Sequence, residues 1–300
     1  MKKRLLTFGC SFTAYSWPSY ADIFSIYFDE YQNWALAGLG NRAIAERIAE
    51  CHAIENINEN DVVIVQWSTH LRNDFFSIGP AIDRRPGWRT SGSLFNYKNV
   101  DLYPQKWFDI FFHEPAYLMH TLNEIVLIQN LLNATGCTWY MTSIGDLRNV
   151  GTDILEGDGY GENVLPFKSQ GDYVGWENSP ILKETYNKHI WVKHKEHWLK
   201  PLSVFCKESM PNDFYEFTKG DNDFHPSTKQ HAHWVLQELK PKFDFIEENK
   251  TLELAKIVEK LFDSSYRNRK SMEKHLYFSE ELRNFNGLKW PNLPKGIHTC

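Results

Sequence analysis

Short apolar runs and helical repeats alternate along the first half of the chain. Four short apolar runs predict strands, at residues 5–8, 34–37, 61–67 and 138–143. Apolar positions at helical spacing predict helices between them, at residues 19–28, 44–51 and 117–132. Because strands that alternate with helices form parallel sheets, the pattern predicts an α/β fold whose sheet carries helices on both faces.

Two long stretches break this alternation. Residues 72–114 carry several Arg and Trp without periodicity, and residues 146–212 change from Gly-rich and acidic to rich in His, Trp and Lys. Both are predicted to be insertions in loops after strands, where α/β proteins place their ligand contacts. Residues 1–245 would then form one domain and residues 246–300 a charged helical extension. An apolar stripe predicts that this extension docks on the domain, on a protein partner or on a second copy: Leu254, Ile257, Val258, Leu261 and Phe262.

The composition excludes several classes of protein. Hydrophobic residues make up 42% and charged residues 24% of the 300 positions, which argues against a disordered or fibrous chain. The 38 acidic residues outnumber the 33 Lys and Arg, and the net charge of −5 argues against nucleic acid as a partner. No window of 18 apolar residues predicts a membrane span, and the apolar run near the first residue is too short for an export signal. We therefore expect a cytoplasmic protein with no membrane partner.

The cysteines and histidines give no metal site. The five cysteines are scattered and form no CxxC pair, which favours reduced thiols: Cys10, Cys51, Cys137, Cys206 and Cys300. His194 and His197 could share one face of a helix, but their Lys- and Trp-rich surroundings lack a ligand-type acid pair and favour a solvated amphipathic helix. Neither a metal nor a cofactor is expected.

Ser11 is the first candidate for chemistry. It lies in Gly9-Cys-Ser-Phe-Thr13, where the first predicted strand gives way to the first helical region. A serine at the carboxyl edge of the sheet could act as a nucleophile beside a helix N-terminus, which favours developing negative charge. It could equally cap that helix. The G-x-S-x-G elbow is absent, because Thr13 stands where the second glycine would be, and this disfavours an ordinary α/β-hydrolase.

His225 is the second candidate. Ser227-Thr-Lys-Gln230 is a capping-box pattern, followed by apolar residues at helical spacing, so Ser227 is predicted to cap a helix. His225 precedes this cap in a loop, with Asp221 and Asp223 shortly upstream. A neighbouring carboxylate fixes the tautomer of an imidazole and stabilises its charged form, so His225 could be a catalytic base. The alternative is an ordinary surface histidine, which is the usual role of a lone histidine in a loop.

Two further loops could bind a substrate. Gly38-Leu-Gly40-Asn-Arg-Ala43 fits the G-x-G-x-x-A dinucleotide pattern, but the next strand ends without the acid that would hold a ribose. The same turn could instead present a backbone N–H to an oxyanion. After the strand at 61–67 come polar side chains that could donate to an oxyanion or only satisfy the loop backbone: Ser68, Thr69, His70 and Asn73.

Together these four segments resemble the SGNH (GDSL-like) hydrolases, a family of flavodoxin-like serine esterases. Gly9-Cys-Ser11 stands where that family has Gly-Asp-Ser, with Cys10 in place of the Asp. Gly38 matches the family's second block, with Gly40 as the alternative. The resemblance implies a three-layer α/β fold, Ser11 as the nucleophile, and the backbone of Gly38 in the oxyanion hole.

The family's last block is matched in this sequence, and its third block is not. Asp223-Phe-His225-Pro-Ser matches the last block, which implies His225 as the general base and Asp223, or Asp221, as the residue that orients it. The family's third block, Gly-x-Asn-Asp, does not occur. Its oxyanion donor would have to come from the loop between Ser68 and Asn73. The resemblance covers roughly residues 1–145 and 213–240.

These segments and their resemblance to the SGNH hydrolases predict a serine-dependent ester hydrolase.

The aromatic residues bear on the substrate. The 11 Trp, 14 Tyr and 20 Phe make up 15% of the chain. We expect Phe8, Trp67, Trp139 and Tyr140 to lie in or beside the core. Five other tryptophans in the insertions could rim the site and favour an O-acylated, for example O-acetylated, carbohydrate as the substrate: Trp88, Trp107, Trp176, Trp191 and Trp198. The alternatives are a non-catalytic glycan-binding or structural protein with the same fold, and a nucleotide-binding oxidoreductase.

Overall fold

Four parallel strands form the centre of the protein. The computed structural model describes residues 4–77, 87–93, 105–111, 114–147, 181–215, 225–262 and 269–290. The strands lie in the order β2-β1-β3-β6. They are β1 (Arg4–Phe8), β2 (Glu30–Asn33), β3 (Asp61–Trp67) and β6 (Thr138–Ser143), and all three pairings between them are parallel. The predicted parallel α/β sheet is confirmed.

The strands at the centre and at the edge of this sheet differ in sequence. All seven positions of β3 are buried, which explains its continuous apolar run. The second strand was expected at residues 34–37, and this is wrong, because β2 is the polar segment Glu30–Asn33. In the described sheet β2 pairs only with β1, and its outer positions can therefore be polar. Trp34 follows the strand and is buried against Phe8, with a centroid distance of 6.2 Å between the rings.

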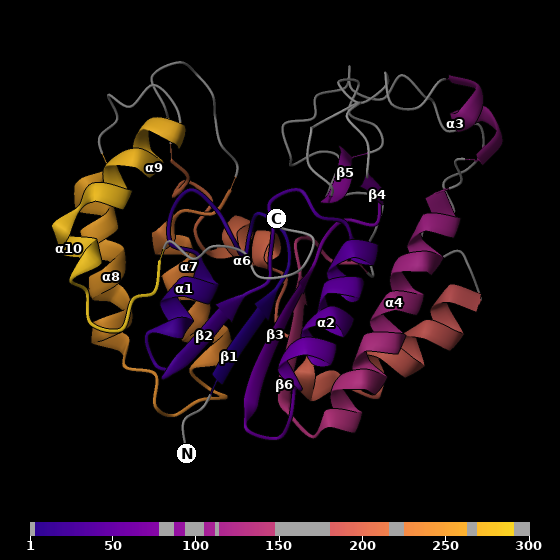
Figure 1. Cartoon of the computed structure of the whole chain (residues 1–300), viewed down its shortest axis with the longest axis horizontal. Helices are drawn as coiled ribbons and strands as arrows, with labels where there is room; N and C mark the ends of the chain where they lie inside the picture. The colour runs from indigo at the N-terminus through magenta and orange to yellow at the C-terminus, as the bar shows by residue number, and fades with distance from the viewer. Residues whose placement is uncertain are drawn as a thin grey trace.

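Helices cover both faces of the sheet, as Figure 1 shows. One face carries α2 (Asn41–Glu55) and α4 (Glu114–Thr135), which pack against each other. The other carries α1 (Tyr20–Ser25) and α7 (Thr228–Trp234), and α7 runs on into η5 (Val235–Leu239). The expectation of helices on both faces is confirmed. The chain leaves β1 towards β2 and then returns to β3 on the other side, so a topological switch point lies at the carboxyl end of β1, where sheets of this kind bind ligands.

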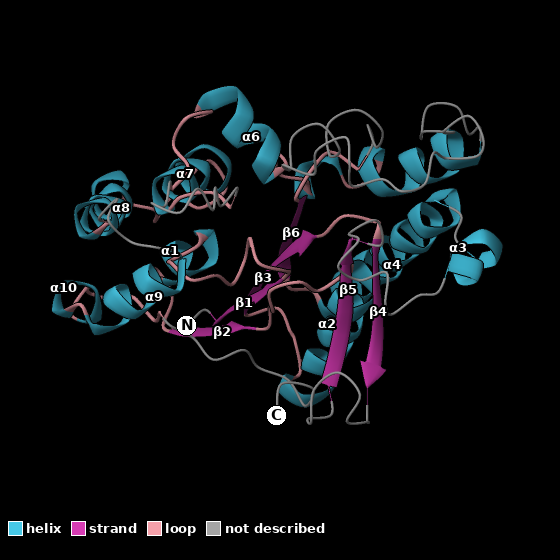
Figure 2. Ribbon diagram, turned by 90° about the horizontal axis from the view of Figure 1, so that it is seen from above, coloured by secondary structure: helices cyan, strands magenta, loops and turns pink. Residues whose placement is uncertain are grey.

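Both predicted insertions contain regular structure in their described parts. The first forms an antiparallel hairpin, β4 (Arg72–Ser77) with β5 (Gly87–Ser93), and a short helix, α3 (Gln105–Phe111). Figure 2 shows the hairpin beside α2. The second insertion contains a π-helix, η3 (Ile181–Val192), the 3₁₀ turn η4 (Lys195–His197), and α6 (Leu202–Ser209).

Two tryptophans of the second insertion pack at the edge of β6, Trp191 buried in the core and Trp198 half-buried against it. Trp198 forms a parallel bridge with Met141 of β6, which extends the sheet beyond its edge. Trp191 is 8% exposed, and its ring lies 5.6 Å from that of Trp198. The expectation that these two rings rim a site is wrong, because both pack at the outer edge of β6, where they cover the last strand of the sheet. Trp176 and the side chain of Trp88 lie outside the described residues.

The histidines of the second insertion pack against the same edge. His197 stacks on Trp139 with a centroid distance of 3.9 Å, and its Nδ1 lies 2.7 Å from the Trp139 carbonyl oxygen. His194 is buried. The solvated amphipathic helix expected here is therefore wrong. No group of three metal-ligating side chains occurs within the described ranges.

The described part of the C-terminal extension docks on the domain. It forms α8 (Glu248–Leu261), α9 (Arg269–Phe278) and α10 (Glu280–Arg283). Helix α8 packs on α7 through the predicted stripe, where Leu254 and Val258 are fully buried, and α9 and α10 pack on α8. Of the three expectations for the stripe, docking on the protein's own domain is confirmed.

Several expectations from composition can also be compared with the structure. Phe8, Trp67 and Trp139 are buried as predicted, and Tyr140 is half-buried beside them. Four cysteines are unpaired and buried, as reduced thiols require, and Cys300 lies outside the described residues: Cys10, Cys51, Cys137 and Cys206. Within the described ranges, none of the helices has the length and apolar character to span a bilayer.

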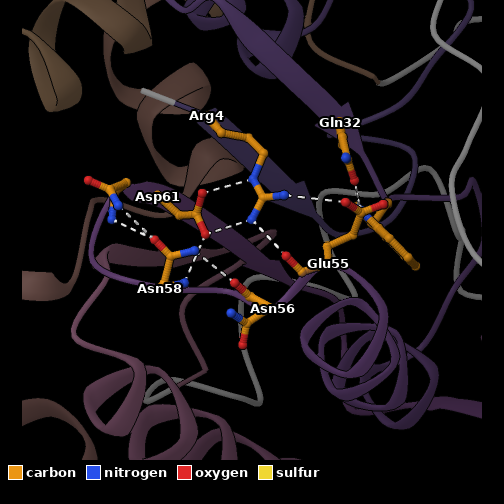
Figure 3. A network of polar contacts seen from close by, with 8 residues as sticks. Arg4, Gln32, Glu55, Asn56, Asn58 and Asp61 are labelled. Atoms are coloured by element: carbon orange, nitrogen blue, oxygen red, sulfur yellow. Dashed lines mark hydrogen bonds and ion pairs between the residues drawn. The ribbon is translucent and has the colours of Figure 1, made fainter. Parts of the chain in front are cut away.

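An ion-pair cluster closes the amino end of the sheet (Figure 3). Arg4 begins β1 and Asp61 begins β3, and the two residues are register partners. The Arg4 Nε and Nη2 atoms donate to the two Asp61 carboxylate oxygens, each at 2.8 Å. Its Nη1 reaches Glu55 at 3.3 Å, at the end of α2. The hydrogen bond and charge of Asp61 raise the pKa of Arg4. The cluster therefore joins two strands to a helix at the edge opposite Ser11.

Candidate active site

Ser11 and His225 meet at the carboxyl edge of the sheet. The Ser11 Oγ lies 2.8 Å from the His225 Nε2, although the two residues are 214 positions apart in the chain. Ser11 is 6% exposed, and His225 is half-buried. A hydroxyl within hydrogen-bond reach of an imidazole nitrogen is the geometry that a serine nucleophile and its base require. The structure thus brings together the two residues on which the sequence hypothesis depends.

Ser11 lies in a turn of its own, and not at the start of a helix. The Cys10 carbonyl accepts hydrogen bonds from the N–H groups of Thr13 and Ala14. The first helix begins only at Tyr20, where Ser19 is the N-cap in a capping box with Asp22. The alternative that Ser11 caps this helix is therefore wrong, because the helix begins nine residues after Ser11. Pro18 fits this later start, because the residue before a proline is disfavoured in the helical region.

A buried polar network holds this turn. The Thr13 hydroxyl donates to the Gln66 Oε1 at 2.9 Å and lies 3.0 Å from the Tyr20 hydroxyl. The Thr13 carbonyl accepts from the side chains of Ser19, at 2.7 Å, and Asn33, at 3.1 Å. Burial raises the pKa of Tyr20, so that this hydroxyl keeps its proton. The turn around Ser11 is thus fixed by β2, β3 and α1 together.

Gly9 is required where the turn leaves β1. Its φ is +157°, and a Cβ at this position would lie 2.3 Å from the Thr13 Oγ1 and 3.1 Å from the Gln66 carbonyl oxygen. A side chain here would push the turn away from β3. The packing of the turn against β3 therefore explains why position 9 is a glycine, independently of any catalytic role of Ser11.

The loop of His225 is held from two sides. Ser227 caps α7 in a capping box with Gln230, which confirms the predicted cap. The Trp17 indole N–H donates to the Pro226 carbonyl at 2.8 Å, and the Thr228 hydroxyl donates to the Pro18 carbonyl at 3.1 Å. These bonds fasten the loop to the segment that follows the Ser11 turn. Asp221 and Asp223 lie outside the described residues, so the orienting carboxylate stays a prediction.

Gly38 and Gly40 have different structural roles. The Leu39 N–H bonds to the Leu36 carbonyl across a turn in which Gly38 has a φ of +90°. The Gly40 N–H donates to the Asp74 Oδ1 at 2.8 Å, and a Cβ on Gly40 would lie 2.5 Å from the Asp74 Oδ2. Because the Gly40 N–H is already bonded, the alternative of Gly40 as oxyanion donor loses its basis. Gly38 keeps its predicted position in the turn after β2.

Asp74 caps α2 from the hairpin. Its second oxygen accepts the Ala43 N–H at 3.2 Å, and the neighbouring Arg72 donates to the Leu39 carbonyl at 2.8 Å. Asp74 is 6% exposed. A carboxylate therefore occupies the helix N-terminus at which a dinucleotide pyrophosphate would bind. Two anions cannot share this position, which argues against the dinucleotide interpretation of Gly38-Leu-Gly-Asn-Arg-Ala.

The loop after β3 reaches the same edge as Ser11. The β1–β3 register pairs Phe8 with Val65, and Ser11 and Ser68 each lie three residues further on. Asn41 fixes this loop, since its Oδ1 accepts the Ser68 N–H at 2.7 Å and its Nδ2 donates to the Ser68 carbonyl at 3.1 Å. Ser68 is fully buried, and its Oγ has no partner among the described residues. In this conformation its hydroxyl lies beneath the surface that a substrate would contact.

The other candidates of this loop differ in position. Thr69 accepts the Leu71 N–H at 3.3 Å, so its hydroxyl satisfies the loop backbone. His70 is 2% exposed. Asn73 lies further along, in β4, between the two hairpin residues that contact the start of α2. The predicted donors are therefore not equivalent, and none is hydrogen-bonded to Ser11 within the described part of the chain.

Sequence reasoning missed the residues that hold the site. The sequence patterns above assign no role to Gln66, Asn41 or Asp74. A polar residue inside an apolar strand, as Gln66 is in β3, is the one signal that could have indicated a buried network. Asp74 gives no comparable signal, because its partners lie more than 30 positions away.

Compared with known proteins, the chain gives no significant match to a protein-family model, a curated protein or a solved structure. Its function must therefore be inferred from the geometry of Ser11, His225 and their surroundings.

Proposed function

We propose that the protein is a serine-dependent ester hydrolase of the SGNH type. The observation that carries the proposal is the 2.8 Å contact between the Ser11 Oγ and the His225 Nε2. This contact lies at the switch point of a parallel α/β sheet, where ligands bind in folds of this type. The order of the parallel strands, and the positions of the Ser11, Gly38 and His225 segments after or around them, support the resemblance to that family.

The reaction would proceed through an acyl-enzyme. His225 accepts the Ser11 hydroxyl proton while the Oγ attacks the ester carbonyl carbon, which gives a tetrahedral oxyanion. When this intermediate collapses, the bond to the alcohol oxygen breaks and His225 returns the proton to the leaving alcohol. A water then attacks the acyl carbon, again with His225 as the base, and releases the acid and Ser11. Asp223, or Asp221, would orient the imidazole.

Backbone donors would stabilise the oxyanion. Gly38 lies in a turn with positive φ at the same sheet edge as Ser11, where the Leu36 N–H bonds to the Gly9 carbonyl. We assign the N–H groups of Ser11 and Gly38 to the oxyanion. Ser68 and Asn73 remain candidates for a side-chain donor, and Ser68 would have to move towards the surface to reach a substrate.

An acyl ester of a carbohydrate is the substrate class to test first. Because Trp191 and Trp198 pack against β6, the remaining tryptophans that could contact a sugar are the half-buried Trp107 on α3 and those whose side chains lie outside the described residues. Short acyl esters are therefore the appropriate first probe, and O-acetylated sugars the second.

Hydrolysis of p-nitrophenyl acetate by purified variants tests the proposal. Ser11→Ala and His225→Ala should each reduce kcat by at least about a thousandfold, since nucleophile and base act as one unit. Ser209→Ala, which alters an exposed serine at the end of α6, is the matched control and should keep full activity. Unchanged turnover in Ser11→Ala would overturn the proposal.

Labelling and titration separate the alternatives. A fluorophosphonate probe should label Ser11 in the folded wild type and lose this label in His225→Ala. A folded wild type that is neither labelled nor active would favour a non-catalytic binding protein. Fluorescence titration with NADH should show no binding, because Asp74 occupies the start of α2.

A further inference from the structure

The imidazole of His225 is covered face-to-face by an aromatic ring. The Tyr15 ring lies parallel to it, with a centroid distance of 3.8 Å and an interplanar angle of 14°. We propose that Tyr15 is a positioning residue that holds the His225 imidazole towards Ser11 and stabilises the positive charge that this ring takes up during the reaction. The proposal rests on the proposed function, since it assigns Tyr15 a part in the same proton transfer.

A second ring restricts the imidazole from another side. Phe12 follows Ser11 in the same turn, and its ring meets the His225 ring edge-on, at 5.2 Å and 68°. Rotating the imidazole about its Cβ–Cγ bond would require it to cross one of these two rings. The stack therefore limits the imidazole to orientations that keep its Nε2 directed at the Ser11 hydroxyl, 2.8 Å away.

Tyr15 is itself held in place by the segment that fixes the His225 backbone. The Tyr15 ring packs edge-on against Trp17, at 4.6 Å and 84°. Trp17 is fully buried, lies against Tyr215, and donates its indole N–H to the Pro226 carbonyl. One short segment thus fixes both the ring of His225, through Tyr15, and the residue that follows it, through Trp17. Such double attachment is what a base needs to be held within a fraction of an ångström.

The face of the Tyr15 ring also has an electrostatic effect. An aromatic face carries partial negative charge and attracts a cation placed over it. His225 becomes an imidazolium when it accepts the Ser11 proton, so the attraction is stronger in the transition state than in the resting site. An interaction of this kind raises kcat more than it lowers KM. Phenylalanine supplies the same face, whereas leucine fills a similar volume without it.

A pair of substitutions separates the electrostatic role from packing. In steady-state hydrolysis of p-nitrophenyl acetate, Tyr15→Phe should keep kcat within about twofold, and Tyr15→Leu should lower kcat by about tenfold with little change in KM. Rates are expressed per Ser11 labelled by a fluorophosphonate, so that partial unfolding does not count as lost catalysis. If Tyr15→Leu yields too little folded protein, Tyr15→Met serves with the same expectation.

Tyr140→Leu is the matched control. Tyr140 is a half-buried tyrosine on β6 whose ring also lies near a histidine, 5.9 Å from His197, on a different element from Ser11. Its kcat per labelled serine should not change.

The possible outcomes are distinct from those that test the function. A Tyr15→Leu enzyme with wild-type kcat, in a protein whose activity depends on Ser11, would overturn the role of Tyr15 and leave the hydrolase proposal standing. Equal losses in Tyr15→Phe and Tyr15→Leu would also overturn it, because the aromatic face would then make no difference. A wild type without Ser11-dependent activity would overturn the hydrolase proposal itself.

Discussion

Polar side chains at the two ends of the parallel sheet differ in whether their atoms find hydrogen-bond partners. At the amino end, each guanidinium nitrogen of Arg4 has a partner, in Asp61 or Glu55. At the carboxyl end, the Gln66 Nε2 and the Ser68 Oγ are buried and find no partner within the described residues. Both ends join the same two strands, β1 and β3.

The difference separates a structural cluster from a candidate site. At the amino end the charges neutralise each other and every guanidinium nitrogen has a protein partner, so this cluster serves to join elements of the fold. Unpaired buried polar atoms cost stability, so a fold that keeps them needs another reason for them. Beside Ser11 and His225, we propose that this reason is the chemistry of the proposed hydrolase. Changes at the amino end should therefore alter stability without affecting turnover, and changes at the carboxyl end should affect turnover.

The largest effect on stability is expected at Asp61. Asp61→Ala leaves Arg4 with only its Glu55 contacts at a site where Asp61 is 3% exposed, and should lower the free energy of unfolding by about 3 kcal/mol. Urea denaturation measures this loss. The kcat per labelled Ser11 should stay at the wild-type value, and a tenfold drop would show that the two ends are not independent.

Glu46→Ala is the control for that substitution. Glu46 pairs with Arg42 across one turn of α2, where their side chains are 44% and 68% exposed. An exposed pair of this kind contributes about 0.3–0.5 kcal/mol. A loss as large as that of Asp61→Ala would mean that burial does not distinguish the two ion pairs.

The second largest effect is a pH-dependent change in stability, and it is caused by His231 on α7. Burial, together with the nearby His225, lowers the pKa of His231 from 6.5 to about 3. Between these values the unfolded chain binds a proton at His231 and the folded protein does not, so stability is present above pH 6.5 and is lost as the pH falls towards 3. At pH 5 this histidine should lower the free energy of unfolding by about 2 kcal/mol relative to its value at pH 7.5.

Urea unfolding of His231→Leu at the two pH values measures that contribution. The variant should lose less stability between pH 7.5 and pH 5 than the wild type, by about 2 kcal/mol. The Nδ1 of His231 has no hydrogen-bond partner within the described residues, so leucine removes no polar contact made by that atom. Identical pH dependence in the two proteins would refute the assignment.

Asp74→Asn should lower stability less than Asp61→Ala does, and it should also lower turnover. Asp74→Asn keeps the volume but removes the negative charge from the start of α2, which should cost about 1 kcal/mol. Because Asp74 holds the segment after the Gly38 turn, kcat should fall severalfold. Asp74→Asn should therefore lower stability slightly and kcat clearly, whereas Asp61→Ala should lower stability strongly and leave kcat unchanged. Thermal unfolding and initial rates on the same samples compare the two.

Local patterns predicted the features that depend on neighbouring residues. The fully buried β3, the capping box of Ser227 and the apolar stripe of α8 all follow from spacing within one element, and all three are present. The second strand was misplaced because an edge strand needs no apolar run, while Trp34, just beyond it, is buried by tertiary packing. Trp198 was misplaced because nothing in its own sequence indicates the open edge of β6.

By itself, therefore, the sequence determined the α/β class, the positions of three of the four parallel strands along the chain, and which loops carry a serine and a histidine. The tertiary structure alone decided that Ser11 and His225 lie 2.8 Å apart, that Tyr15 covers the imidazole, and that Asp74 occupies the start of α2. Periodicity and capping act over a few residues and can be recognised in one segment. Contacts between residues many positions apart depend on how helices pack across a whole sheet, and no single segment carries that information.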